Sequence, residues 1–280
     1  MVNWLDGFIN LIRTINDILT AGIAITAFSL LLYALTFNLR DRVARSFAMI
    51  LVCVVVVFTA EALGGIALDD ANMEFWLKLQ WLGIVLLPPT YLHFSDALVA
   101  TTGRPSRWRR RWAVRITYLF SLFLLVLIPF DILVGPITAD SLSAPHLQRT
   151  LITELFTIYY WIIMLLSWIN FFRAYIRTVT PVSRRRMGYL VVGALAPAIG
   201  SFPFLLYGSG LADRLDGMFW VVVTVSNLIF YVLIILMAYA VAFFGVAWSD
   251  RVVKTRLLKW IMRGPVTASL ALGLTTLVRR

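Results

Sequence analysis

The sequence predicts an all-α membrane protein, a bundle of seven transmembrane helices with room for an eighth apolar helix at the C-terminus. Of its 280 residues, 61% are hydrophobic and only 14% are charged, whereas a soluble chain carries roughly 25% charged residues. Seven apolar stretches reach the roughly 20 residues that a helix needs to cross a bilayer. Their continuous apolarity excludes a β-barrel, whose strands alternate apolar and polar residues.

The predicted spans follow one another without a repeat, a flexible linker or a soluble domain. They cover residues 18–37, 47–67, 75–98, 113–131, 151–172, 187–207 and 218–245, so that the bundle as a whole occupies 18–248. The longest loop on the outer side, about 132–150, is too short to fold alone. A ligand would therefore have to reach the bundle itself.

Residues 1–17 precede the first span and form a separate predicted element. They lack the basic start and the small-residue cleavage site of a signal peptide. Their apolar residues recur at helical spacing, which predicts a helix lying on the outer membrane surface. These residues are Leu5, Phe8, Ile9, Ile12 and Ile15, with Trp4 beside them.

Basic residues fix the predicted orientation. Segments 38–46, 99–115, 173–186 and 249–263 hold three, six, five and five of them, nineteen in all, whereas the opposite side holds four. Because Lys and Arg concentrate in cytoplasmic loops, this asymmetry predicts a multi-pass membrane protein with its N-terminus outside. The net charge of +11 then reflects topology and anionic headgroups, and it does not indicate nucleic-acid binding.

The C-terminal tail divides into two predicted parts. Residues 249–263 read as a juxtamembrane amphipathic helix on the cytoplasmic headgroups, where Lys254, Arg256 and Lys259 would couple the bundle to the next cytoplasmic element. The alternative is a flank that only fixes topology. Residues 264–280 begin with a Gly-Pro break and continue as an apolar segment. Its stretch 266–278 would be about 20 Å long as a helix, which is short for a span.

Polar and aromatic residues at one predicted depth on four spans are the candidate ligand-binding residues. An ionisable group inside a span is expensive and is a functional candidate by default, so Glu61 leads the set. Together these side chains predict an outward-facing aromatic-polar cavity, although interfacial aromatic belts form without any ligand. The other members are Gln80, Trp81, Tyr160, Trp161, Asn227 and Tyr231.

His93 and Asp96 lie three residues apart, hence on one helical face near the cytoplasmic end of the third span. Such a pair predicts a pH-sensitive site or a proton relay. The alternative is a polar helix end that meets the headgroups. Pro88-Pro89 and, in the sixth span, Pro197 and Pro203 remove helix hydrogen bonds and predict kinks.

Several motifs of catalytic and cofactor sites are missing from the sequence. The segment 218–245 has no lysine for a retinal Schiff base, and Cys53 is the single cysteine. Only His93 lies in a span, so two haem-ligating histidines are not available there. We find no phosphate loop, zinc motif or nucleophile elbow. The sequence therefore predicts no catalytic residue, no metal and no cofactor.

The third span, FWLKLQWLGIVLLPPTYLHFSDAL (75–98), resembles the N-terminal seven-transmembrane sensor domain of bacterial histidine kinases and of related GAF, PAS and diguanylate cyclase signalling proteins. The resemblance rests on its aromatic-rich start, its glycine, its proline pair and its Phe-containing inner end. It implies an input module in the bacterial inner membrane, acting on a cytoplasmic signalling domain in cis or in trans. No ligand carries over from the family, and the expected one is an unidentified small molecule or lipid. After residue 248 the chain departs from that pattern, as a fragment or a stand-alone relative would.

Two functions are left open. The first is a sensory input domain, with a homodimer as one assembly. The alternative is a small transporter or a membrane-integrated enzyme. A transporter favours inverted repeats and polar groups at the midplane, and the predicted midplane here is nearly free of charge. An intramembrane enzyme needs clustered His, Asp or Glu, which only His93 and Asp96 approach.

The predicted orientation is testable by cysteine labelling in a Cys53→Ser background. An impermeant reagent added from outside should modify a cysteine placed at Asp140 or Asp213. It should not modify one placed at Ser106 or Ser183, because these lie among the basic segments. The reverse labelling pattern would overturn the topology.

Overall fold

The computed structural model describes residues 2–37, 41–65, 69–103, 108–137, 146–200 and 216–242, together with Thr255, Lys259 and Gly264. These residues form a helical bundle with one small β-hairpin. The helices are α1 (Val2–Phe37), α2 (Arg42–Gly64), α3 (Asp70–Thr101), α4 (Trp108–Leu127), α5 (Leu151–Arg177), α6 (Pro181–Gly193), α7 (Ala196–Ile199) and α10 (Asp216–Val241). The strands are β1 (Val134–Ile137) and β2 (Leu147–Arg149).

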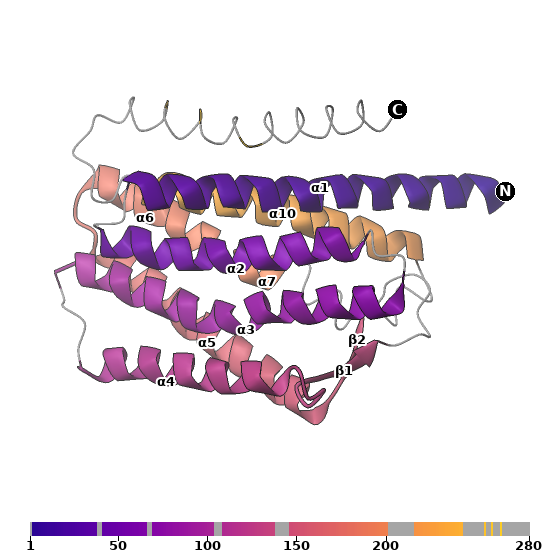
Figure 1. The fold of residues 1–280 in the computed structure, drawn as a ribbon. Coiled ribbons are helices and arrows are strands. Elements are labelled where there is room, and N and C mark those ends of the chain that lie inside the picture. Colours follow the sequence, from indigo (N-terminus) through magenta and orange to yellow (C-terminus); the bar gives the residue numbers. More distant parts are fainter. Residues whose placement is uncertain are drawn as a thin grey trace.

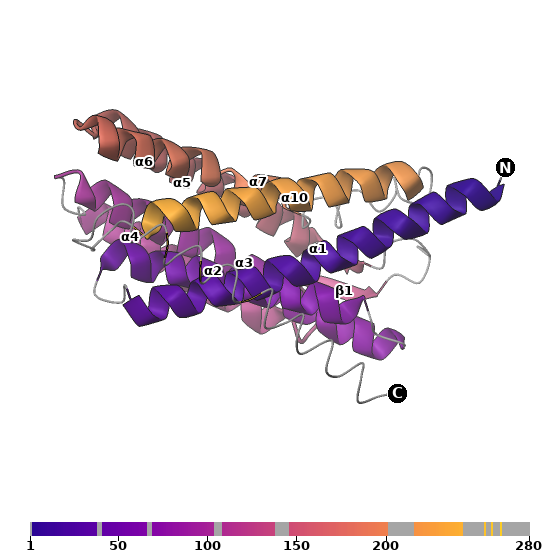
Figure 2. The same cartoon turned by 90° about the horizontal axis from the view of Figure 1, so that it is seen from above.

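Helix α3 lies at the centre of the arrangement, in contact with α2, α4, α5 and both strands. On the other side, α10 contacts α1, α2, α6 and α7. Helices α1 to α5 alternate in direction, and α10 lies beside α1 and runs toward the same end of the bundle (Figures 1 and 2). We call the end that bears β1 and β2 the hairpin end. The opposite end, where α2, α4 and α6 begin among arginines, is the arginine end.

Five helices of the described residues are long and apolar enough to cross a membrane: α1, α2, α3, α5 and α10. They match five of the seven predicted spans. The fourth predicted span corresponds to α4, whose first turns hold Arg109, Arg110, Arg111 and Arg115 and leave a short apolar part. The sixth, predicted over 187–207, is interrupted within the described residues, and 201–207 lie outside them.

The interruption of the sixth predicted span has a local cause. Helix α6 ends at Gly193, a turn covers Ala194 and Leu195, and α7 begins at Ala196. Pro197 lacks an N–H for the carbonyl of Gly193, and its ring clashes with a helical carbonyl at that position. The helix therefore stops four residues before the proline, as a break where the sequence predicted a kink.

Helix α1 also differs from expectation. It runs from Val2 to Phe37 without a break, about 54 Å at helical rise, and extends past its neighbours at the hairpin end (Figure 1). The helix is thus continuous across residues 17 and 18, where the sequence predicts a boundary between a surface helix and the first span, and the position of 1–17 on the membrane surface stays a prediction. The predictions for 249–263 and 264–280 lie outside the described residues, apart from Thr255, Lys259 and Gly264.

The hairpin lies within the stretch 132–150 that was predicted to be a loop. Strand β1 pairs antiparallel with β2, with Val134 opposite Arg149 and Ile137 opposite Leu147. The turn before it is tied to α3, because Lys78 forms ion pairs of 2.6 Å with both Glu74 and Asp131. The hairpin therefore packs on the start of the central helix.

Close packing of α2 against α3 depends on Gly83. A Cβ atom at this position would lie 2.7 Å from the Cys53 carbonyl oxygen and 2.7 Å from Val57 Cγ2. Helices in lipid gain little from the hydrophobic effect and associate through such close contacts. The proline pair that follows, Pro88-Pro89, lies inside the continuous helix α3 and is buried. Helices α2, α4 and α5 pack around α3.

Replacing Gly83 by alanine should lower the free energy of unfolding by about 1–3 kcal/mol, because the methyl group must displace the α2 backbone. The matched control is Gly22→Ala on α1, where a Cβ meets nothing within 4 Å. That change should be neutral or stabilising by up to about 1 kcal/mol, since alanine is the better helix former. Denaturation in detergent followed by circular dichroism measures both, and equal effects would contradict the role of Gly83.

Candidate functional site

A cavity of about 30 Å³ lies inside the bundle where five helical segments meet. Its described walls come from α2, α3, α5, α10 and the broken stretch that contains α7. The lining residues are Val54, Val57, Phe58, Ile84, Leu87, Tyr160, Pro197, Gly200 and Phe230. Eight of these nine have no polar side-chain atom, so the cavity is an apolar one.

Among the described lining residues, Tyr160 has the single polar side chain, and this residue is buried. Its hydroxyl donates a hydrogen bond of 3.0 Å to the Pro197 carbonyl oxygen, in the stretch where the helix breaks. Phe156, one turn earlier on α5, packs between the rings of Tyr160 and Trp81, at 6.0 Å and 5.6 Å between centroids. One aromatic group thus holds α3, α5 and α7 together beside the cavity.

The predicted ligand residues lie about one helical turn nearer the hairpin end than the cavity. Of them, only Tyr160 is among the described lining residues. On α2 the lining residue is Phe58 and the predicted one Glu61; on α3 they are Ile84 and Trp81; on α10 they are Phe230 and Asn227. Because three residues make almost one turn, these three predicted residues lie about one helical turn away from the lining residue on the same helix.

The other predicted residues make contacts between helices. Gln80 Nε2 donates to Glu61 Oε2 at 3.2 Å, which joins α3 to α2. Trp161 is 46% exposed on the outside of α5, next in sequence to the buried Tyr160. Within the part of the chain that the structure describes, Gln80 and Glu61 thus contact each other, whereas Trp161 faces outward.

Asn227 and Tyr231 connect the last helix to the first. Asn227 Nδ2 donates to Asn16 Oδ1 at 3.1 Å, and both residues are buried. The hydroxyls of Tyr231 and Thr26 lie 3.0 Å apart, about three turns further along α1. A polar stripe thus follows the α1–α10 contact. Neither Asn16 nor Thr26 was predicted from the sequence, because single polar residues in an apolar span do not reveal which helix faces them.

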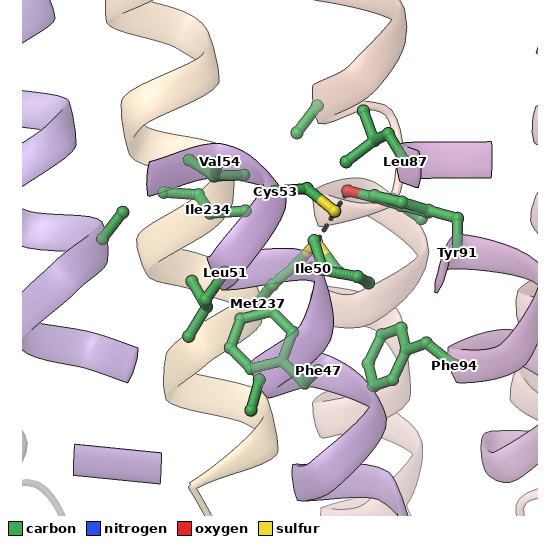
Figure 3. Close-up of a cluster of buried hydrophobic side chains, with 14 of the residues drawn as sticks. Phe47, Ile50, Leu51, Cys53, Val54, Leu87, Tyr91, Phe94, Ile234 and Met237 are labelled. Atoms are coloured by element: carbon green, nitrogen blue, oxygen red, sulfur yellow. Dashed lines mark hydrogen bonds between the residues drawn. The ribbon is translucent and has the colours of Figure 1, made fainter. Parts of the chain in front are cut away.

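Toward the arginine end, the core contains sulfur and aromatic groups in close contact (Figure 3). The Tyr91 hydroxyl is directed at the Met237 sulfur at 3.7 Å, which links α3 to α10. Cys53 Sγ lies 4.0 Å from Thr90 Oγ1. These contacts were not predicted, since Tyr91 and Met237 are separated by 146 positions and have no motif in common.

His93 and Asp96 have separate partners at the arginine end. Asp96 Oδ1 lies 3.3 Å from Arg110 Nη1, so the carboxylate pairs with the start of α4. His93 Nδ1 lies 3.4 Å from the Tyr118 hydroxyl, which is also on α4. Both residues thus join α3 to α4. Among the described residues no group of three or more His, Cys, Asp or Glu side chains gathers in a way that would hold a metal ion.

Comparison with known proteins bears on the whole of this arrangement. The family model described as the N-terminal 7TM region of histidine kinase matches residues 19–235. The matched range contains every described residue of the cavity lining. No curated protein matches the chain. Together with the five long apolar helices, the family match supports a membrane-spanning domain.

Tyr160→Phe should loosen the broken segment, because the Pro197 carbonyl loses its hydroxyl donor at a cost of about 1 kcal/mol. Amide hydrogen exchange of residues 196–200 should then become faster. The neighbouring Tyr159→Phe is the control: that hydroxyl donates to the Thr117 carbonyl at 3.2 Å, on α4. Equal exchange rates in the two variants would show that the bond to Pro197 does not hold α7.

Proposed function

The chain belongs to the family of the N-terminal 7TM region of histidine kinase, and from this premise we propose that it is a membrane-embedded sensory input domain. In this proposal the bundle crosses the membrane seven times, with α4 and the interrupted α6–α7 stretch as the two further spans. A ligand or a change in the membrane alters helix packing inside the bundle. A cytoplasmic output domain, in cis or in trans, receives that change.

The observation that carries this proposal is the position of the cavity beside the broken helix. Its walls combine the well-packed α2 and α3 with the short α7, which has only Ala196–Ile199. A four-residue helix with a turn before it and a bend after it has few backbone bonds of its own. An occupant of the cavity would therefore bias the bundle between two packings mainly by moving this wall.

Helix α10 is the proposed route out of the site. Phe230 on α10 lines the cavity, and a Cβ at Gly200 would lie 3.3 Å from its ring, so the two walls touch. One to two turns further along, α6 approaches α10 at Gly193, where a Cβ would collide with the Met237 side chain and lie 3.1 Å from the Leu233 carbonyl. Movement of the α6–α7 stretch is thereby transmitted directly to α10.

The proposed orientation places the arginine end in the cytoplasm. Arg109, Arg110 and Arg111 begin α4 there, and Arg184, Arg185 and Arg186 begin α6. Both groups suit anionic headgroups of the inner leaflet. Because α10 runs toward this end, a change in its position would reach segment 249–263, which follows it in the sequence. In that segment Lys254, Arg256 and Lys259 remain the proposed coupling residues.

Gly193→Leu should separate α6 from α10 and change the output. Spin labels at Val182 on α6 and Val232 on α10, both exposed, report the separation by pulsed electron spin resonance in nanodiscs of the Cys53→Ser chain. The distance should increase, because the new side chain meets backbone as well as Met237. Phosphorylation of the output kinase, in the full receptor that carries this domain, should shift with it.

The matched control is Gly188→Leu on the same helix. A Cβ there meets only the Tyr175 ring, at an ordinary 3.6 Å. Distance and kinase output should both stay at the wild-type values. A Gly193→Leu receptor with increased separation but unchanged output would contradict signalling through α10.

A further inference from the structure

We propose that the cavity is a binding site for a small, neutral, apolar molecule, with α7 as its movable wall. This inference gives the proposed sensory function its ligand class, and it rests on that function for its physiological meaning. The chemical class of the ligand is inferred from the described lining residues alone. Its test therefore measures occupancy of the cavity and not signalling.

The lining excludes charged ligands. None of the nine described lining residues is a carboxylate, a lysine, an arginine or a histidine, so an ion would enter without a counter-charge. Moving an isolated ion into such surroundings is among the most expensive transfers in protein chemistry. Phosphates, carboxylates and amines, which are common effectors of soluble sensors, are therefore poor ligands for this site.

Strongly polar neutral ligands are excluded by the hydrogen bonds already made. The one lining hydroxyl, on Tyr160, donates its proton to the Pro197 carbonyl at 3.0 Å. Two polar groups that the sequence predicted for this site donate elsewhere: Gln80 Nε2 to Glu61, and Asn227 Nδ2 to Asn16. Asn227 Oδ1 has no partner among the described residues, but Asn227 is not a described lining residue. A ligand with several donors and acceptors would leave them unpaired in the interior, at about 1–3 kcal/mol each.

The size of the cavity and the shortness of α7 indicate which wall a ligand would move. The cavity volume of about 30 Å³ exceeds the roughly 10–15 Å³ that one water molecule needs. Apolar cavities stay free of water yet accept xenon and benzene when large enough. A larger apolar molecule must displace a wall, and α7 is the shortest helix of the described lining, with four residues. Ala198 N–H to Leu195 O and Gly200 N–H to Ala196 O tie its two ends.

The test uses xenon as an apolar probe and iodide as a charged one, with crystals of the whole chain grown in a lipidic phase. Anomalous scattering locates both. Xenon should occupy the space between Val57, Ile84 and Phe230, and iodide should be absent from it. Val54→Leu should abolish the xenon signal by filling the cavity, whereas Val52→Leu, at a residue 47% exposed on the same helix, should leave it unchanged.

A second variant covers the case in which Val54→Leu fails to fold. Leu87→Ala enlarges the cavity and should raise xenon occupancy relative to wild type. Absence of xenon from both wild type and Leu87→Ala, or iodide in the cavity, would overturn the proposed ligand class. The sensory function is judged separately, by the α6–α10 distance and kinase output of Gly193→Leu, so the two proposals fail independently.

Discussion

Every backbone polar group in a bilayer must find its partner inside the protein, and this constraint governs how the bundle accommodates its prolines. Helix α3 keeps Pro88-Pro89 within one continuous helix, covered by α2, α4 and α5. The stretch around Pro197 breaks, and the Tyr160 hydroxyl supplies a donor for its carbonyl. The cavity, its short wall α7 and the contact of that wall with α10 all depend on the helix break at Pro197.

Glycines decide where the helices come closest. At Gly83, α3 approaches the backbone of α2, and at Gly193, α6 approaches that of α10. The first contact fixes two long, well-covered helices, whereas the second joins a short interrupted helix to a long one. The bundle thus combines long helices around α3 with the short, interrupted helices α6 and α7. Such a division suits a domain that must respond without unfolding.

Some features of the structure could be predicted from the sequence and others could not, for physical reasons. Five spans were predicted because apolar length is a local property. The rotation of each helix was not, since helices that are apolar all round show no preferred face: adjacent Tyr160 and Trp161 were both proposed, and one is buried while the other faces outward. His93 and Asp96 share a face as predicted, but Arg110 and Tyr118 come from a different helix. The hairpin escaped notice because its VGPI strand contains glycine and proline, which strands disfavour.

The polar stripe between α1 and α10 has a consequence for the biosynthesis of the domain. Asn16 finds its partner Asn227 only 211 positions later, and translation at roughly 5–20 residues per second separates the two helices by on the order of ten to forty seconds. During that interval Asn16 has no Asn227 side chain to accept from. The contact between α1 and α10 can therefore form only after α10 has been synthesised, however early the other helices pack.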